Sequence, residues 1–318
     1  MKTYDFMSSL KDEMMHFIRL KQLSGSDCYA QAKILRYFDR FLYSEGFEEK
    51  ILTRSIFQSY FNTLGHLHPR TFSNRYGLLR QFSIWFNRIH RASCILEKRS
   101  TVNRSQSRPA YIFCLDEIKA ILLNCHRFSS KEECIKNLYL ALFSLLYSTG
   151  IRIGEALALN WEDYAPDEKL IHIRKGKFSK QRYLILSCSM AKCLDEYQTI
   201  YRSTLLKEND SPLFLNTRKN RLRLHNAHLA LRKVLKMSKI DKGKNTGPRL
   251  HDFRHTFAVH RLLGWYKTEK DINSKLPFLA TYMGHVNINC TCIYLQATSE
   301  LLQAGCERFH AFFLSHNT

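Results

Sequence analysis

Six side chains between residues 152 and 294 are of the types that transfer of a phosphodiester requires. They are Arg152, Lys177, His251, Arg254, His285 and Tyr294. They lie in four separate stretches, STGIRIGEALALNW, GKFSKQR, LHDFRHTFAVH and MGHVNINCTCIYL. Each stretch alone has a structural explanation, because surface arginines, solvated lysines in turns and half-buried tyrosines are common. Together, and in this order, they favour chemistry on a phosphate.

The residue types match the charges of such a reaction. Attack on a phosphodiester builds negative charge on its non-bridging oxygens, which the guanidinium groups of Arg152 and Arg254 can hold through bidentate hydrogen bonds. A phenol with an ordinary pKa of about 10 is a poor nucleophile, so Tyr294 needs a base. His251 is the candidate base, because its spacing from Arg254 places both on one face of a predicted helix.

The leaving group also needs assistance. A departing 5′ oxygen is a basic alkoxide, and an acid beside it contributes about a hundredfold to ten-thousandfold in rate. Lys177, on a flexible turn, can donate that proton, while His285 would add a hydrogen bond to the phosphate. The set is sufficient without a metal, and we expect no metal and no other cofactor.

The elements that must position these residues form a second, larger domain. Asp116 can cap a helix that runs through Leu123, and the stretch EECIKNLYLALFSLLYS predicts a buried helix. Two β-rich runs, Leu170 to Arg174 and Arg182 to Leu186, predict a hairpin with a basic turn. Further helices are expected over residues 189–203 and 224–239 and after Pro248.

Residues 1 to about 94 predict a separate helical unit, because apolar residues recur at three- and four-residue steps in three segments. Its aromatic residues are interpreted as core. The polar, basic and aperiodic stretch LEKRSTVNRSQSRP that follows is typical of an interdomain linker. The basic residues that could contact DNA in these segments and in the hairpin are Arg70, Arg75, Arg80, Arg88, Lys98, Arg99, Arg104 and Lys180.

The charge of the chain points to a polyanionic partner. Its 318 residues carry 49 Lys and Arg against 28 Asp and Glu, a formal net charge of +21. Nucleic acid is the commonest partner of such a protein, although a merely basic surface is the simpler alternative.

The ten cysteines form no CxxC pair, and their irregular spacing favours a reduced compartment over a disulfide framework or a zinc site. With no apolar run long enough for a membrane span, we expect a cytoplasmic, nucleoid-associated protein.

The four stretches closely resemble the motifs of the tyrosine recombinase (phage integrase) family. STGIRIGEALALNWEDY is similar to its first arginine box, GKFSKQR to its hairpin GKGxKxR, LHDFRHTFA to its HxLRH box and MGHVNINCTCIYL to its LGHxxxxxTxxYx box. The resemblance assigns catalytic roles to the six residues and a supporting role to Glu155. Phe178 replaces a common glycine, which leaves Lys175 or Lys180 as possible substitutes for Lys177. The stretch GWYKTEKDINSKLPFLATYMGH is longer than in many Xer-like members and favours a mobile-element role.

The resemblance also implies an architecture and a reaction. The expected fold is mostly α with a small β-sheet, and its two domains would close as a C-shaped clamp on double-stranded DNA. The expected segments are a core-binding domain (1–95), a linker (96–110), a catalytic domain (111–297) and a C-terminal interaction helix (298–318). Tyr294 would form a 3′-phosphotyrosine for integration, excision or transposition. Four copies would act on two sites through a Holliday junction.

The tail and the competing functions leave alternatives open. Leu302, Cys306, Phe309 and Phe313 form an apolar stripe that can dock on a neighbouring copy or on its own domain. A type IB topoisomerase-like enzyme would use similar residues to relax DNA, and a catalytically silent DNA-binding accessory protein would keep only the fold. A metal nuclease is disfavoured because no acidic cluster accompanies the histidines.

Overall fold

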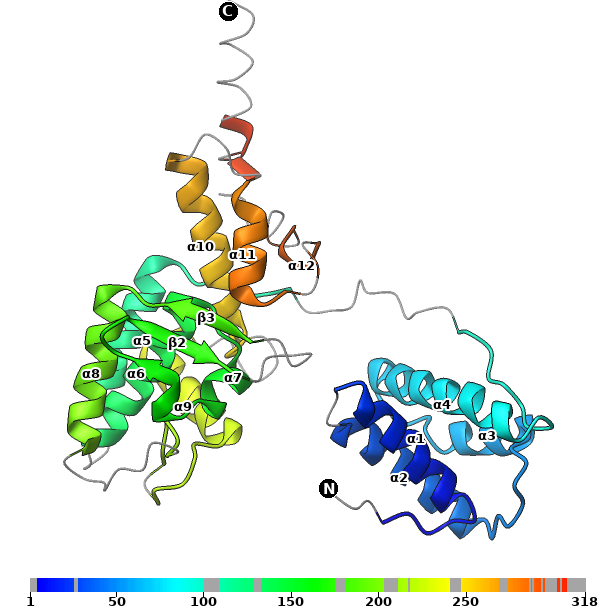
Figure 1. Ribbon diagram of the computed structural model, residues 1–318. Coiled ribbons are helices and arrows are strands. Elements are labelled where there is room, and N and C mark those ends of the chain that lie inside the picture. The colour runs from blue at the N-terminus through cyan, green and yellow to red at the C-terminus, as the bar shows by residue number, and fades with distance from the viewer. Residues whose placement is uncertain are drawn as a thin grey trace, which may run out of the picture. The chain divides into compact units, whose positions relative to one another are not determined.

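The chain is organised as two units, residues 1–108 and 109–318, in the computed structural model (Figure 1). The described residues are mostly helical and include one small sheet, which confirms the predicted fold class. None of the described helices is both long and apolar enough to cross a membrane. The structure describes residues 5–25, 28–99, 109–127, 133–174, 181–202, 211–216, 218–240, 247–268, 274–285, 287, 289–292, 294, 302–303 and 305–307.

The first unit is helical in its described part. Its helices are α1 (Lys11–Leu23), α2 (Tyr29–Ser44), α3 (Arg54–Asn62) and α4 (Pro69–Ile89). The apolar stripes of these helices meet in one core, in which Phe38 of α2 stacks on Phe57 of α3 and Phe17 of α1 meets Phe82 of α4 edge to face. The aromatic residues of this unit therefore serve mainly as core, as their helical spacing predicts.

One buried carboxylate fixes the start of α1 to α2. Asp39 has no exposed surface and accepts hydrogen bonds from the backbone N–H groups of Met7 and Ser8, at 2.8 and 3.0 Å. The Ser8 hydroxyl donates to the same carboxylate at 2.7 Å. The donors that precede α1 thus find their acceptor on another helix, as buried N–H groups require.

Replacing Asp39 with alanine is expected to destabilise α1, because two buried donors and one partly buried donor lose a charged acceptor. The free energy of opening of α1 should fall by about 3 kcal/mol, which is about a hundredfold in amide protection. Hydrogen exchange of the α1 amides in the full-length chain measures this. Asp5 is an exposed carboxylate near the same end, and Asp5→Ala should leave the protection unchanged. Unchanged protection in Asp39→Ala would contradict the anchoring role.

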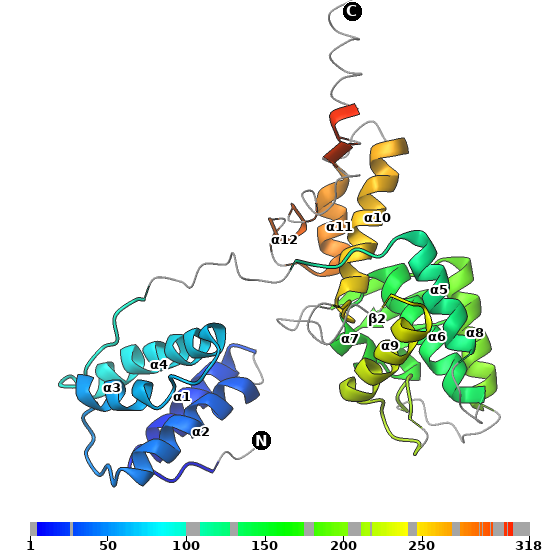
Figure 2. The same ribbon diagram turned by 180° about the vertical axis from the view of Figure 1, so that it is seen from behind.

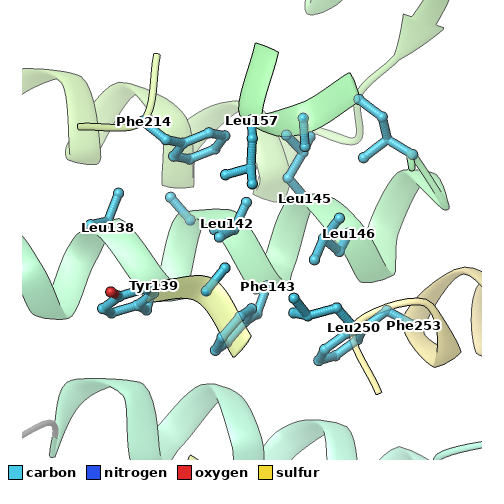
Figure 3. Packing of buried hydrophobic residues seen from close by; sticks show 14 of the residues in the cluster. Leu138, Tyr139, Leu142, Phe143, Leu145, Leu146, Leu157, Phe214, Leu250 and Phe253 are labelled. Carbon is cyan, nitrogen blue, oxygen red and sulfur yellow. The ribbon is translucent and has the colours of Figure 1, made fainter. Parts of the chain in front are cut away.

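The core of the second unit surrounds α6 (Glu133–Thr149), which confirms the buried helix predicted there. Figure 3 shows its side chains between those of Leu157 and Phe214 and those of Leu250 and Phe253. Phe143 of α6 stacks on Phe253 with ring centroids 5.7 Å apart, so α6 is tied to the helix that carries Arg254. The helices packed around this core include α5 (Leu115–His126), α8 (Cys188–Arg202) and α9 (Leu224–Met237).

The described strands form an antiparallel sheet in the order β1-β2-β3. They are β1 (Tyr164–Ala165), β2 (Leu170–Ile173) and β3 (Arg182–Ile185). The pairing of Ile171 with Leu184, both fully buried, confirms the predicted hairpin and turns its apolar face to the core. The two-residue β1 is too short to give a sequence pattern. The basic turn, residues 175–180, lies outside the described residues.

The remaining helices bring distant segments next to the sheet. They are α7 (Ile153–Ala158), which the 3-10 turn η2 (Trp161–Asp163) follows, α10 (Asp252–Thr268), α11 (Lys275–Met283) and α12 (Asn289–Cys292). α10 and α11 lie side by side in both views (Figures 1 and 2). Phe257 and Leu262 of α10 share an apolar cluster with Leu279 and Met283 of α11, which sets the two helices against each other.

Two helix starts differ from the sequence prediction. Asp116 does not cap α5, because the carboxylate of Glu117 reaches back to the N–H of Cys114 at 2.9 Å and the helix begins at Leu115. His251 does not lie on the face of α10, which begins one residue later. Its carbonyl instead accepts the N–H groups of Arg254 and His255 in the first turn of that helix, at 3.1 and 3.4 Å.

Candidate active site

Arg152 stands at the start of α7, as predicted, and joins two segments far apart in sequence. Its Nη1 donates to Glu155 Oε1 and its Nη2 to the carbonyl of Gly284, each at 2.9 Å. The Arg152 side chain remains 24% exposed, so an anion can approach it. Glu155 is nearly buried, and its supporting role stays a prediction.

Arg254 lies on the buried side of α10 and is only 2% exposed. It donates to the carbonyl of Gly150 through Nη1 and to that of Met283 through Nη2, both at 2.7 Å. Burial and, to a smaller extent, the neighbouring charge of Arg152 lower the pKa of Arg254 to about 10. The guanidinium is nevertheless charged at neutral pH.

A glycine allows the two arginines to approach each other. Gly150 has a left-handed φ of +62°, and a side chain there would collide with the ring of Phe257. The tight turn directs the Gly150 carbonyl to Arg254 and places Arg152 two residues later. The glycine that precedes the first arginine in the sequence is therefore a geometric requirement.

A third arginine, Arg182, completes a buried ionic cluster. It is the first residue of β3, its side chain is 10% exposed, and it donates to both Glu155 oxygens, from Nη1 at 3.2 Å and from Nη2 at 2.6 Å. Burial alone would raise the pKa of the Glu155 carboxyl. The hydrogen bond and charge of Arg182, with the charge of Arg152, outweigh burial and hold this pKa below its ordinary value.

Three histidines and Tyr294 lie together beside the arginines. The Tyr294 ring centroid is 5.3 Å from that of His255 and 6.0 Å from that of His285. His255 in turn meets His251 at 4.8 Å, edge to face. Nδ1 of His285 lies 2.7 Å from the Thr291 hydroxyl, which orients its ring. His255 thus stands between His251 and Tyr294.

Tyr294 is held within the protein. It is 5% exposed and belongs to the apolar cluster of α10 and α11. The Tyr294 phenol acts to raise the pKa of Arg254, so the phenol and the guanidinium are electrostatic neighbours. The spacing of nine residues from His285 therefore returns the phenol to the same site by way of α12.

The histidines resist protonation in the folded protein. Burial and, to a smaller extent, the neighbouring basic groups lower the pKa of His251 and of His285 to about 4. Burial also lowers the pKa of His255. All three rings are neutral at neutral pH and can accept a proton. The negative charge of a bound phosphodiester would raise these values towards neutrality.

These lowered pKa values predict that the second unit loses stability in mild acid. The unfolded histidines bind protons below their ordinary pKa of 6.5, whereas the folded ones do so only near pH 4. Stability should therefore be constant above about pH 6.5 and fall as the pH decreases from there to about 4. Urea unfolding of the full-length chain at several pH values measures this. His285→Asn should weaken the dependence, whereas the exposed His126→Asn should not. A flat profile would contradict the lowered pKa of the half-buried His285 ring.

The structure brings together most of the residues predicted for the site. Those in one neighbourhood are Arg152, His251, Arg254, His285 and Tyr294. Lys177, with its possible substitutes Lys175 and Lys180, lies outside the described residues. Its role as the acid stays a prediction.

The predicted DNA contacts fall into two groups in the first unit. Arg70, Arg88, Lys98 and Arg99 are exposed, whereas Arg75 and Arg80 are half-buried. The guanidinium of Arg75 lies 4.2 Å from the centre of the Tyr37 ring, so this side chain also takes part in packing. Arg104 lies outside the described residues.

In the tail, Leu302 and Cys306 are exposed, while Phe309 and Phe313 are outside the described part.

Sequence reasoning assigned no role to two residues of the site, Arg182 and His255. The signal for Arg182 was its place at the end of the stretch GKFSKQR, and the signal for His255 was its place directly after Arg254. Neither residue stands out by type or by periodicity. Their contacts with Glu155 and Tyr294 arise only when separate elements meet.

Comparison with known proteins extends the likeness beyond the site. Residues 113–300 match the model of the phage integrase family. A Sinorhizobium fredii protein provisionally named integrase/recombinase y4rE is 29% identical over 305 residues, 95% of this chain and 96% of its own. Tyrosine recombinase XerD of Corynebacterium glutamicum is 32% identical over 163 residues, 51% of this chain and 49% of its own. The Tn1549 transposon integrase, solved with transposon right-end DNA, shares the fold with a TM-score of 0.63 and 15% identity, covering 96% of this chain and all of its own.

Proposed function

This chain belongs to the phage integrase family and is a tyrosine site-specific recombinase, and we propose that it cuts DNA by joining Tyr294 to a 3′ phosphate. The observation that carries the proposal is the placing of a tyrosine, two arginines and three histidines in one neighbourhood, from segments that together span residues 152 to 294. The net charge of +21 supports double-stranded DNA as the partner.

In the proposed step the Tyr294 oxygen attacks phosphorus. A bond forms between this oxygen and the 3′ phosphate, the bond from phosphorus to the 5′ oxygen breaks, and the 5′ oxygen leaves as a hydroxyl. Arg152 and Arg254 neutralise the charge that develops on the non-bridging oxygens. The reverse step, with a 5′ hydroxyl from another strand, rejoins the DNA and releases Tyr294. The covalent link conserves the bond energy, so no energy source is required.

Protons are assigned to groups near the reacting atoms. The proton of Tyr294 passes to the His255–His251 pair, whose rings are neutral at neutral pH. His285, oriented by Thr291, donates or accepts a hydrogen bond at the phosphate. Lys177 supplies the proton to the leaving 5′ oxygen, as the family motif implies.

The biological role follows from the same reasoning. We assign the chain to the integration, excision or transposition of a mobile element, because its fold is shared with a transposon integrase and its stretch GWYKTEKDINSKLPFLATYMGH is longer than in many Xer-like members. The reaction joins two DNA sites, so we assign a homotetramer of recombinase on those sites. The C-terminal helix would contact either the same copy or its neighbour.

The test is covalent capture of DNA. Nicked duplexes tiled over the DNA on either side of the gene are incubated with the full-length protein and EDTA, and products are separated on a denaturing gel. A protein–DNA adduct is expected, and peptide mass spectrometry should place the phosphate on Tyr294. Attachment through another residue, or free cut ends that require a metal, would contradict the proposal. Relaxation of supercoiled DNA without any joining of two sites would indicate a topoisomerase instead.

A further inference from the structure

The carboxyl end of α11 is held by its own backbone and also by side chains from other elements. A helix leaves its last carbonyl oxygens without intrahelical donors. Here the N–H groups of Gly284 and His285 turn back to the carbonyls of Thr281 and Ala280, both at 2.9 Å. The left-handed φ of Gly284, +67°, allows this turn.

The next three carbonyls in the chain each accept a hydrogen bond from a different arginine. The pairs are Tyr282 with Arg182 at 3.0 Å, Met283 with Arg254 at 2.7 Å and Gly284 with Arg152 at 2.9 Å. Consecutive peptide groups of one turn therefore set the positions of all three guanidinium groups. The turn leads directly into His285.

Electrostatics explains how three like charges share this space. The carboxyl end of a helix carries a partial negative charge, and the Glu155 carboxylate adds a full one between Arg152 and Arg182. The cluster then keeps a net positive charge of about two units. This excess suits a phosphodiester, which carries one negative charge and gains more during the reaction.

Arg182 differs from the other two arginines in its exposure and its partners. Each of its three nitrogen atoms donates within the protein, Nε to Tyr282 and both Nη atoms to Glu155. Its guanidinium also packs against Gly284, where an added Cβ would come within 2.9 Å of Nη1. These contacts join β3, α7 and the end of α11 at one point.

We propose that Arg182 is a positioning residue for strand cleavage, which bridges Glu155 and the end of α11 so that Arg152 and His285 face the phosphate together. The inference rests on the proposed function, since it assigns Arg182 a part in the same reaction. Arg182 does not touch the reacting atoms. It acts through Glu155 and the Tyr282 carbonyl.

Lysine is the informative replacement for Arg182. A single ammonium group keeps the charge but cannot hold the carboxylate and the carbonyl in the same fork geometry. Arg152 would then lose its fixed direction. We expect Arg182→Lys to slow single-turnover adduct formation about a hundredfold, the effect typical of a displacement of about 1 Å, with DNA affinity changed less than about threefold.

Arg221→Lys is the matched control. Arg221 is an arginine of the same unit that donates to the carbonyls of Leu157 and Leu159 at 2.8 and 3.0 Å, at the opposite end of α7 from Arg152. Its replacement should lower the melting temperature as much as Arg182→Lys does, without slowing adduct formation. Equal slowing in both variants would reduce Arg182 to a structural role and overturn the inference.

A modified substrate separates positioning from general damage. Once the attachment point is mapped, a duplex can be made with a methylphosphonate at that linkage. Its methyl group replaces one non-bridging oxygen and removes the negative charge that Arg152 is proposed to neutralise. The defect of Arg182→Lys should shrink at least about tenfold on this duplex, because misplacement of Arg152 then matters less. An undiminished defect would overturn the inference.

The outcomes also separate this inference from the proposed function. Failure of the unsubstituted protein to form any Tyr294 adduct contradicts the proposed function. If the unsubstituted protein forms the Tyr294 adduct and Arg182→Lys forms it at the same rate, only the inference is contradicted. Should Arg182→Lys unfold at the assay temperature, Glu155→Gln tests the same bridge from its other side and should slow the reaction at least about tenfold. A normal rate in Glu155→Gln would overturn the inference.

Discussion

Tyr294→Phe is expected to abolish covalent attachment to DNA, lowering the cleavage rate by at least about 10⁴-fold. The substitution removes one oxygen atom, the one that would bond to phosphorus, and leaves the ring in its apolar cluster. DNA affinity and thermal stability should therefore stay close to those of the unsubstituted protein. Adduct formation on the nicked duplexes and gel-shift titration measure the two quantities separately.

Tyr147→Phe is the matched control for the loss of a tyrosine hydroxyl. Tyr147 is half-buried, and its hydroxyl lies 3.1 Å from Nδ1 of His260, so a histidine is its neighbour as well. It should retain full adduct formation. Residual adduct in Tyr294→Phe at the normal rate would assign the nucleophile to another residue and remove the basis of the proposed mechanism.

Arg254→Lys is expected to lower the cleavage rate about 10³-fold while leaving DNA affinity within about threefold. The lysine keeps a positive charge but loses the two parallel N–H donors that a guanidinium offers to phosphate oxygens. Since Arg254 is almost fully buried, it contributes little to the initial capture of DNA. Single-turnover rates at saturating protein, compared with binding isotherms, measure this separation.

The stability of these variants needs its own measurement. Arg254→Ala would leave the carbonyls of Gly150 and Met283 without donors and cost about 3 kcal/mol. Arg152→Ala should also remove cleavage but cost less stability, because its side chain is partly exposed. Arg261→Lys, on the exposed side of the same helix as Arg254, should change neither rate nor affinity. Equal losses of binding and cleavage in Arg254→Lys would place Arg254 outside the transition-state clamp.

Secondary structure was largely predictable here because the periodicity is strong and local. The all-round apolar stretch of α6 and the paired β-rich runs of the hairpin need only their neighbours in sequence to form. The errors occurred at helix ends. Asp116 is a plausible cap by residue type, and only the backbone geometry at Cys114 shows that Glu117 takes this role instead. A helix start is decided by one hydrogen bond, which periodicity does not record.

The sequence by itself determined the types of groups available for the chemistry. The motifs identified Arg152, Arg254, His285 and Tyr294 because the charges of a phosphodiester transfer restrict which side chains can serve. What these groups touch was decided only by tertiary structure. Arg182 and His255 look like ordinary basic residues until β3, α10 and α11 meet, when three arginines bind three consecutive carbonyls and His255 faces Tyr294. Local spacing cannot encode such contacts, because each depends on the packing of elements that are distant in sequence.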